Sequence, residues 1–117
     1  MRAVEFVESV YLAVYRTAID GVIRIVKGPP GRRPREDLVA LSKGFNGLDE
    51  LGQERARALV RLAVDQSVFG MLAALDGTRA LGNNSDLRVL VDDNDVTATH
   101  DLHDLFRARV DQELGYD

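Results

Sequence analysis

The hydrophobic and polar positions of this chain follow a helical period over most of its length. Between residues 3 and 26, apolar side chains such as Val7 and Val14 recur at steps of three and four positions, which is the period of one helix face. Charged residues such as Glu8 and Arg24 form the opposite stripe. The pattern predicts an amphipathic helix over residues 3–26, which a Gly-Pro-Pro-Gly sequence at positions 28–31 ends.

The stretch from residue 52 to residue 76 predicts a second long helix that is apolar over most of its circumference. Three small residues, Ala56, Ala63 and Gly70, recur along it at intervals of seven positions. Such a helix has to be covered on most sides, and small residues let a neighbouring backbone come close. Its length of roughly 36 Å, at about 1.5 Å per residue, nearly outspans a domain with a radius of gyration of roughly 13 Å. We therefore expect the two long helices to lie side by side as an antiparallel pair.

Shorter elements are predicted between and after these helices. Residues 36–45 carry enough apolar positions for a short connecting helix. A loop is expected at residues 81–86, where glycine, asparagine and serine cluster. Alternating apolar positions then predict two strands, at 87–91 and 96–98, joined by a turn at 92–95.

The ends of the helices carry capping residues. Asp49 or Gly52 would cap the start of the second long helix, and Thr99 or Asp101 would cap a last amphipathic helix over residues 102–114. The expected fold class is mainly α (α+β), with a long antiparallel helix pair, a short connecting helix, a small β-hairpin near 87–98 and a C-terminal helix.

Composition places the chain among ordinary globular proteins. Its 117 residues, of which 45% are hydrophobic and 29% charged, predict a single domain over residues 1–117. Disulfides and cysteine metal sites are excluded, because the chain has no cysteine. Glu5 and Glu8 interrupt the apolar N-terminal stretch, which argues against a signal peptide or a membrane span. We expect a cytoplasmic protein without membrane contact, and its 13 arginines against 2 lysines suggest a bacterial, GC-rich coding bias.

Charge is unevenly distributed along the chain. Residues 86–117 hold nine acidic and three basic side chains, a net charge of −6, whereas residues 1–85 carry +2. Because phosphate contacts need basic side chains, we expect no nucleic-acid binding by the acidic region. That region would instead steer towards a basic protein partner. The residues predicted to face the partner are Asp92, Asp93, Asp95, Asp101 and Asp104.

Both histidines of the chain lie within this acidic region. On a helix, His100, His103 and Asp104 would share one face, because they are spaced by three and four positions. Imidazole and carboxylate groups bind zinc and other divalent metals, so these three residues form a candidate metal site. The competing interpretation is structural: Asp101 and Asp104 suit the positive N-terminus of a helix, and the histidines are solvated. Apart from this metal, the sequence predicts no cofactor.

Aromatic residues supply a second candidate site. Tyr11 and Tyr15 are four positions apart on the predicted N-terminal helix, and with Phe69 and Met71 they would line a small-ligand pocket. The competing interpretation places the tyrosines in the core or at an interface. The sequence contains no nucleophile elbow, phosphate-binding loop or dinucleotide-binding glycine pattern, which argues against an enzyme.

Broad apolar helix faces without a catalytic set suggest a protein that acts by binding. The leading hypothesis is a non-enzymatic protein-binding or self-associating module, in which a homodimer covers the apolar surface left open by the chain's own elements. In size, acidity and layout the chain is similar to many small accessory proteins of bacteria, including immunity and antitoxin-type binders. The alternatives are a small metal-dependent enzyme or metal sensor using His100, His103 and Asp104, and a helical bundle that binds a small ligand.

Overall fold

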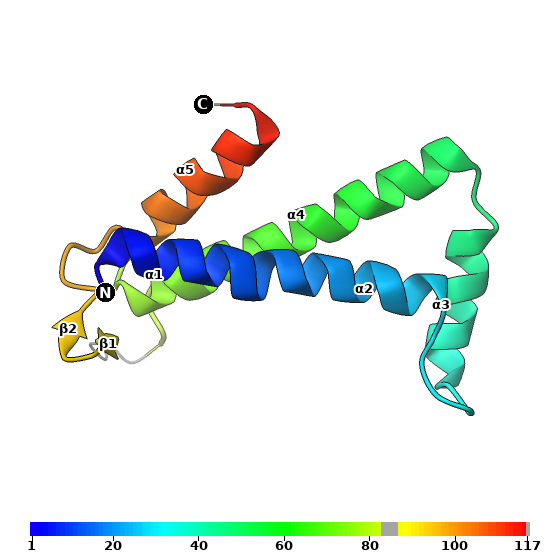
Figure 1. Cartoon of the computed structure of the whole chain (residues 1–117), viewed down its shortest axis with the longest axis horizontal. Coiled ribbons are helices and arrows are strands. Elements are labelled where there is room, and N and C mark those ends of the chain that lie inside the picture. Colours follow the sequence, from blue (N-terminus) through cyan, green and yellow to red (C-terminus); the bar gives the residue numbers. More distant parts are fainter. Residues whose placement is uncertain (83–86, 117) are drawn as a thin grey trace. The chain divides into compact units, whose positions relative to one another are not determined.

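A computed structural model describes residues 1–82 and 87–116 of the chain. The described part is mainly helical with one two-stranded antiparallel sheet (Figure 1), which confirms the fold class expected from the sequence. The chain divides into two compact units. Unit 1 comprises Met1–Tyr15 and Asp65–Asp117, and unit 2 comprises Arg16–Val64. Each unit is described by itself below.

The helices follow the predicted periodicity with small shifts at their ends. The N-terminal helical stretch consists of α1 (Ala3–Val10), a π-helical segment η1 (Tyr11–Arg16) and α2 (Thr17–Lys27). The connecting helix α3 covers Glu36–Asn46, and the long helix α4 covers Glu50–Leu75. The π-helical segment was not predicted, because a single wider turn leaves the apolar pattern of the sequence almost unchanged.

Asp49 caps the start of α4. Its Oδ1 atom accepts a hydrogen bond of 2.7 Å from the backbone N–H of Gly52, which is the third residue of the helix, as expected of a capping aspartate. The sequence left Asp49 and Gly52 as alternative caps, and the structure selects Asp49.

The row of small residues along α4 does not meet the closely packed helix that the sequence suggested. Ala56 is half-buried and Ala63 is exposed. Gly70 is buried, but a Cβ atom there would collide with the guanidinium of Arg79, and no other described group lies close. The last member of the row therefore accommodates a long side chain from the segment after α4.

Helix α4 is long and apolar enough to cross a membrane by length and composition alone. Its most apolar 18-residue stretch has a mean hydropathy of 1.5, and 33% of that stretch is buried. The core helix of a soluble protein has the same length and composition, so this property by itself is weak evidence for a membrane.

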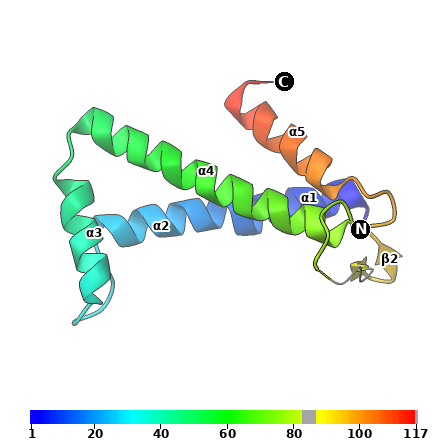
Figure 2. The same ribbon diagram turned by 180° about the vertical axis from the view of Figure 1, so that it is seen from behind.

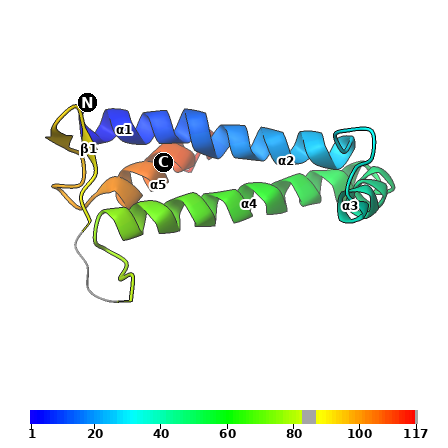
Figure 3. The same ribbon diagram turned by 90° about the horizontal axis from the view of Figure 1, so that it is seen from below.

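Unit 1 has an aromatic core between its helices. Helix α5 (Leu102–Leu114) packs against α1 (Figure 3). Tyr11 and Tyr15 are buried and stack with their ring centroids 5.2 Å apart. Phe106 of α5 is fully buried and meets Tyr15 edge-on at 5.5 Å. Offset and edge-on rings add to the stability gained from burial.

Two arginines of α5 connect it to the other helices of unit 1. Arg107 forms a two-pronged ion pair with Asp65 of α4, at 2.7 and 2.9 Å. Arg109 donates a hydrogen bond of 2.7 Å to Glu8 of α1 and lies 3.9 Å above the ring of Tyr11. Planar guanidinium groups suit both kinds of contact, so these pairs fix how α5 lies in unit 1.

The hairpin of unit 1 is shorter than expected and starts its second strand earlier. Strand β1 (Leu90–Val91) pairs with β2 (Asn94–Asp95), and Val91 lies opposite Asn94. The predicted second strand at 96–98 is therefore wrong. The chain turns already at Asp92 and Asp93, whose φ angles of 50° and 67° are positive. A two-residue loop of this kind reverses the chain most tightly.

The hairpin lies beside the N-terminus of the chain (Figure 2). The side-chain amide of Asn94 donates a hydrogen bond to the carbonyl oxygen of Met1. The loop expected at residues 81–86 falls largely on residues 83–86, which lie outside the described residues.

Unit 2 consists of α2, α3 and residues 50–64 of α4. Helix α2 and this part of α4 run in opposite directions, and α3 lies across one end of them (Figures 1 and 3). At the end of α2, the carbonyl oxygen of Lys27 accepts hydrogen bonds from the side chains of Asn46 at 3.1 Å and Ser42 at 3.5 Å. The side chain of Gln53 donates to the carbonyl oxygen of Phe45 at 3.2 Å. Polar contacts thus hold α3 between the other two segments.

Candidate functional site

An open apolar groove lies between the three helical segments of unit 2. Its volume is about 720 Å³. Apart from one glycine, all residues that line it have apolar side chains, and none carries a charge or a hydroxyl group. The lining residues are Ile23 and Val26 of α2, Ala40, Leu41, Gly44 and Phe45 of α3, Leu48 of the following turn, and Ala56, Leu59, Val60 and Ala63 of α4.

The groove lies where α3 crosses the end of α2 and the beginning of α4. Ile23 and Val26 face it from α2, three positions apart, and Val60 faces it from α4. Bulky residues at such spacing form one stripe of each helix. Small residues such as Ala40 and Ala56 line the space between the bulky ones, so the helices enclose a hollow instead of filling it.

The groove is exposed to a degree that is unusual for apolar side chains. Leu59 is 69% exposed and Leu41 is 59% exposed. All residues of unit 2 are described, and among them only Ser42 and Phe45 are buried. The hydrophobic effect disfavours large contiguous apolar patches on monomeric proteins, and such patches mark surfaces that bind.

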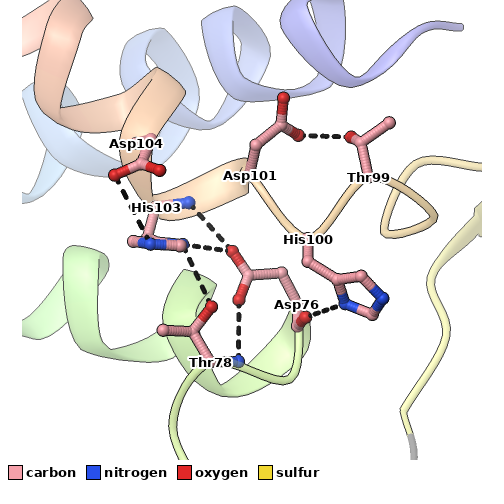
Figure 4. A network of polar contacts seen from close by, with 7 residues as sticks. All are labelled: Asp76, Thr78, Thr99, His100, Asp101, His103 and Asp104. Carbon is pink, nitrogen blue, oxygen red and sulfur yellow. Dashed lines mark hydrogen bonds and ion pairs between the residues drawn. The ribbon is translucent and has the colours of Figure 1, made fainter.

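The residues of the predicted metal site do not share one helix face. His103 and Asp104 are on α5, but His100 precedes the helix with a φ of 55°. His100 uses Nδ1 to donate to the carbonyl oxygen of Asp76 at 2.5 Å (Figure 4). Among the described residues, no three His, Cys, Asp or Glu side chains lie so as to hold a metal ion.

His103 is instead paired with a buried carboxylate. Its Nδ1 atom lies 2.5 Å from Oδ2 of Asp76, and its Nε2 atom lies 3.4 Å from Oδ1 of Asp104 (Figure 4). The Asp76 side chain is fully buried, and its Oδ1 atom accepts a hydrogen bond of 3.0 Å from the backbone N–H of Thr78. Burial would raise the pKa of Asp76, but the hydrogen bonds from His103 and Thr78 outweigh it and hold the pKa below its usual value.

The five aspartates of the predicted partner surface are in different environments. Asp92 and Asp93 are exposed in the hairpin turn, and Asp104 is exposed on α5. Asp95 is half-buried and accepts hydrogen bonds from the N–H and the hydroxyl of Thr97, which lower its pKa. Asp101 is half-buried too and accepts a hydrogen bond from the hydroxyl of Thr99, as Figure 4 shows. Asp95 and Asp101 therefore have local structural partners.

The four residues of the predicted ligand pocket lie in three different settings. Tyr11 and Tyr15 belong to the aromatic core of unit 1. Phe69 is half-buried, with the ring of His103 at 5.7 Å and the guanidinium of Arg107 at 5.0 Å. Met71 is 61% exposed.

Sequence reasoning missed the groove and the role of Asp76. The residues of the groove come from three segments, and periodicity within one helix does not reveal which stripes face one another. For Asp76 a signal was present, because the sequence Asp-Gly-Thr directly after a helix favours an Asx-type turn. Comparison with protein-family models, with curated proteins and with solved structures finds no match to this chain.

Proposed function

We propose that this chain is a non-enzymatic self-associating protein that forms a homodimer through the apolar groove of unit 2. The observation that carries the proposal is the exposure of this groove in a unit with two buried residues, Ser42 and Phe45. A segment of this size is marginal even when it buries a normal share of its surface. A second copy that covers the groove would bury the apolar side chains that unit 2 leaves exposed.

The exposure of bulky side chains within unit 2 supports a second copy as the occupant. Leu41, Leu48 and Leu59 line the groove and are 59%, 44% and 69% exposed. Obligate homodimers bury apolar surface of this kind, because their interfaces are more hydrophobic than those of transient complexes.

The chemistry of the lining also favours a second copy. Obligate dimer interfaces resemble a protein core cut in half, and the groove has no charged group that would select a partner of opposite charge. In a twofold symmetric dimer, Leu41 and Leu59 of each copy would enter the groove of the other, because the same patch faces itself. The glycine and alanines of the groove leave room for them.

The proposed dimer is tested with the full-length chain by size-exclusion chromatography with light scattering over a range of concentrations. The wild-type chain should have the mass of a dimer at micromolar concentrations. Leu59→Asp should raise the dissociation constant about 100-fold or more, since two copies each lose a buried leucine worth about 1.5 kcal/mol or more.

Met71→Asp is the matched control. Met71 is on the same helix and similarly exposed at 61%, but it is outside the groove, so this variant should remain dimeric. A wild-type chain that is monomeric at about 100 μM, a concentration at which obligate dimers persist, would refute the proposal. Equal loss of dimer in both variants would refute the groove as the interface.

The cellular setting belongs to the same proposal. We place the dimer in the bacterial cytoplasm as an accessory protein of the immunity or antitoxin type, with exposed Asp92, Asp93 and Asp104 available to a basic protein partner. Charge reversal of these three residues should weaken such an interaction and leave dimerisation unchanged.

A further inference from the structure

A second cavity of unit 2 lies between α2 and α4. Its volume is about 390 Å³, within the range of small-molecule sites. Four of the side chains that line it are basic and one is acidic. They are Arg24 and Lys27 from α2, Arg57 and Arg61 from α4, and Asp20 from α2, with Ile19 and Ile23 as apolar neighbours.

The four basic groups converge without pairing to carboxylates. Among the described residues, none of the four lies within ion-pair distance of an acid, although the guanidinium of Arg57 lies 5.5 Å above the ring of Phe45. In the sequence, Arg24 and Lys27 are more than 25 positions away from Arg57 and Arg61. Folding brings these like charges to the lining of one open cavity, where Arg24, Lys27 and Arg61 are exposed and Arg57 is half-buried. An anion in the cavity would be attracted by all four.

We propose that this cavity binds a phosphate group. Four cations against one acid leave a formal excess of three positive charges, which suits a dianion better than a single carboxylate. The planar guanidinium groups of Arg24, Arg57 and Arg61 match the geometry of phosphate oxygens. A cavity lined by one sign of charge also concentrates counter-ions within it.

The apolar neighbours indicate what the phosphate is attached to. Ile23 lines both this cavity and the apolar groove, so the two spaces adjoin at one side chain. A phosphate in the basic cavity would therefore place an attached apolar chain next to Val26 and Val60, where it would compete with the second copy for the groove. Free phosphate and a phosphorylated amphiphile both present a phosphate group to the basic cavity, and the test below distinguishes them.

The test is calorimetric titration of the full-length chain at constant ionic strength, with two probes. Inorganic phosphate tests the charged cavity alone, and dodecyl phosphate, below its micelle concentration, tests the cavity and the groove together. At least one probe should bind. Binding of both, with the amphiphile tighter, assigns the site to an amphiphile; equal binding assigns it to the free anion.

Matched variants separate the site from general attraction to a basic surface. The double variant Arg57→Gln/Arg61→Gln should weaken binding about tenfold or more, because charge-assisted hydrogen bonds are lost. The double variant Arg24→Gln/Lys27→Gln removes the two cations of α2 and should weaken binding to a similar degree. Arg32→Gln/Arg33→Gln removes the same charge from the exposed loop after α2 and should leave binding unchanged.

Three results would overturn the proposal: no binding of either probe, an equal loss in the loop variant, or no loss in either cavity variant. Circular dichroism of each variant establishes that the helices are retained. Binding of inorganic phosphate by Leu59→Asp distinguishes this proposal from dimerisation, because that variant removes the groove contact and keeps all four cations.

Discussion

The carboxylate of Asp76 joins the end of α4 to the start of α5 through His103. Its Oδ2 atom accepts a hydrogen bond of 2.5 Å from Nδ1 of His103 and another of 3.2 Å from the backbone N–H of the same residue. His103 is the second residue of α5, so Asp76 satisfies an amide that an N-cap side chain usually satisfies. Asp101 precedes α5 but makes no such bond. The predicted local cap, Thr99 or Asp101, is therefore replaced by a residue from a distant segment.

Replacing Asp76 by alanine should destabilise the protein by about 2–4 kcal/mol, because the buried carboxylate and its charged hydrogen bonds with His103 and Thr78 are lost. Urea denaturation followed by circular dichroism measures the change. Glu113→Ala is the control: Glu113 is an exposed acid of α5, the helix whose first turn Asp76 caps, and its removal should change stability by less than about 0.5 kcal/mol. Similar stability of the two variants would contradict the role assigned to Asp76.

The low pKa of Asp76 predicts a dependence of stability on acid. Folding favours the ionised carboxylate, so its contribution is complete above the ordinary pKa of 3.8 and is lost as the pH falls through the lower folded-state value. The stability difference between the wild type and Asp76→Asn, which cannot titrate, should therefore narrow as the pH falls below about 4. Urea midpoints measured from neutral to strongly acidic pH test this. A difference that stays constant would show that Asp76 does not titrate as described.

The hairpin turn offers a test of backbone conformation. Asp93 has a φ of 67°, a left-handed conformation that glycine adopts without cost and alanine does not. Asp93→Gly should be more stable than Asp93→Ala by about 1 kcal/mol. Both variants remove the same charge, so their difference isolates the conformational effect, and thermal unfolding measures it. Equal melting temperatures would mean that the turn does not require a positive φ at this position.

The secondary structure followed from local patterns, and for that reason most of it could be predicted. Apolar spacing located α3 at Glu36–Asn46 and α5 at Leu102–Leu114 to within about one residue, because a buried stripe repeats every few positions within one segment. The hairpin was predicted less well. The sequence predicted a turn at 92–95, but it has no Asn-Gly or Asp-Gly pair there, so it did not indicate that the loop is only two residues long.

The arrangement of the predicted site residues could not be read from local patterns, because it depends on contacts between segments that are far apart in the sequence. His100 and His103 were expected on one helix face, but α5 begins after His100, and both rings turn to Asp76. Tyr11 and Tyr15 were weighed as pocket or core residues. They are core residues, because Phe106 of α5 packs against Tyr15 and Arg109 of α5 covers the ring of Tyr11. No pattern around either tyrosine indicates which distant ring it meets.

By itself, the sequence determined the helices, the charge distribution and the presence of more apolar helix surface than the chain can easily cover. These are properties of single segments, set by the period of the helix and by composition. Tertiary structure alone decided where that surface stays open, in a groove between α2, α3 and α4, and which side chains converge beside it. Arg24 and Arg57 belong to one basic cavity because their helices run past each other in unit 2. Such a neighbourhood depends on how segments far apart in sequence pack, which no local pattern encodes.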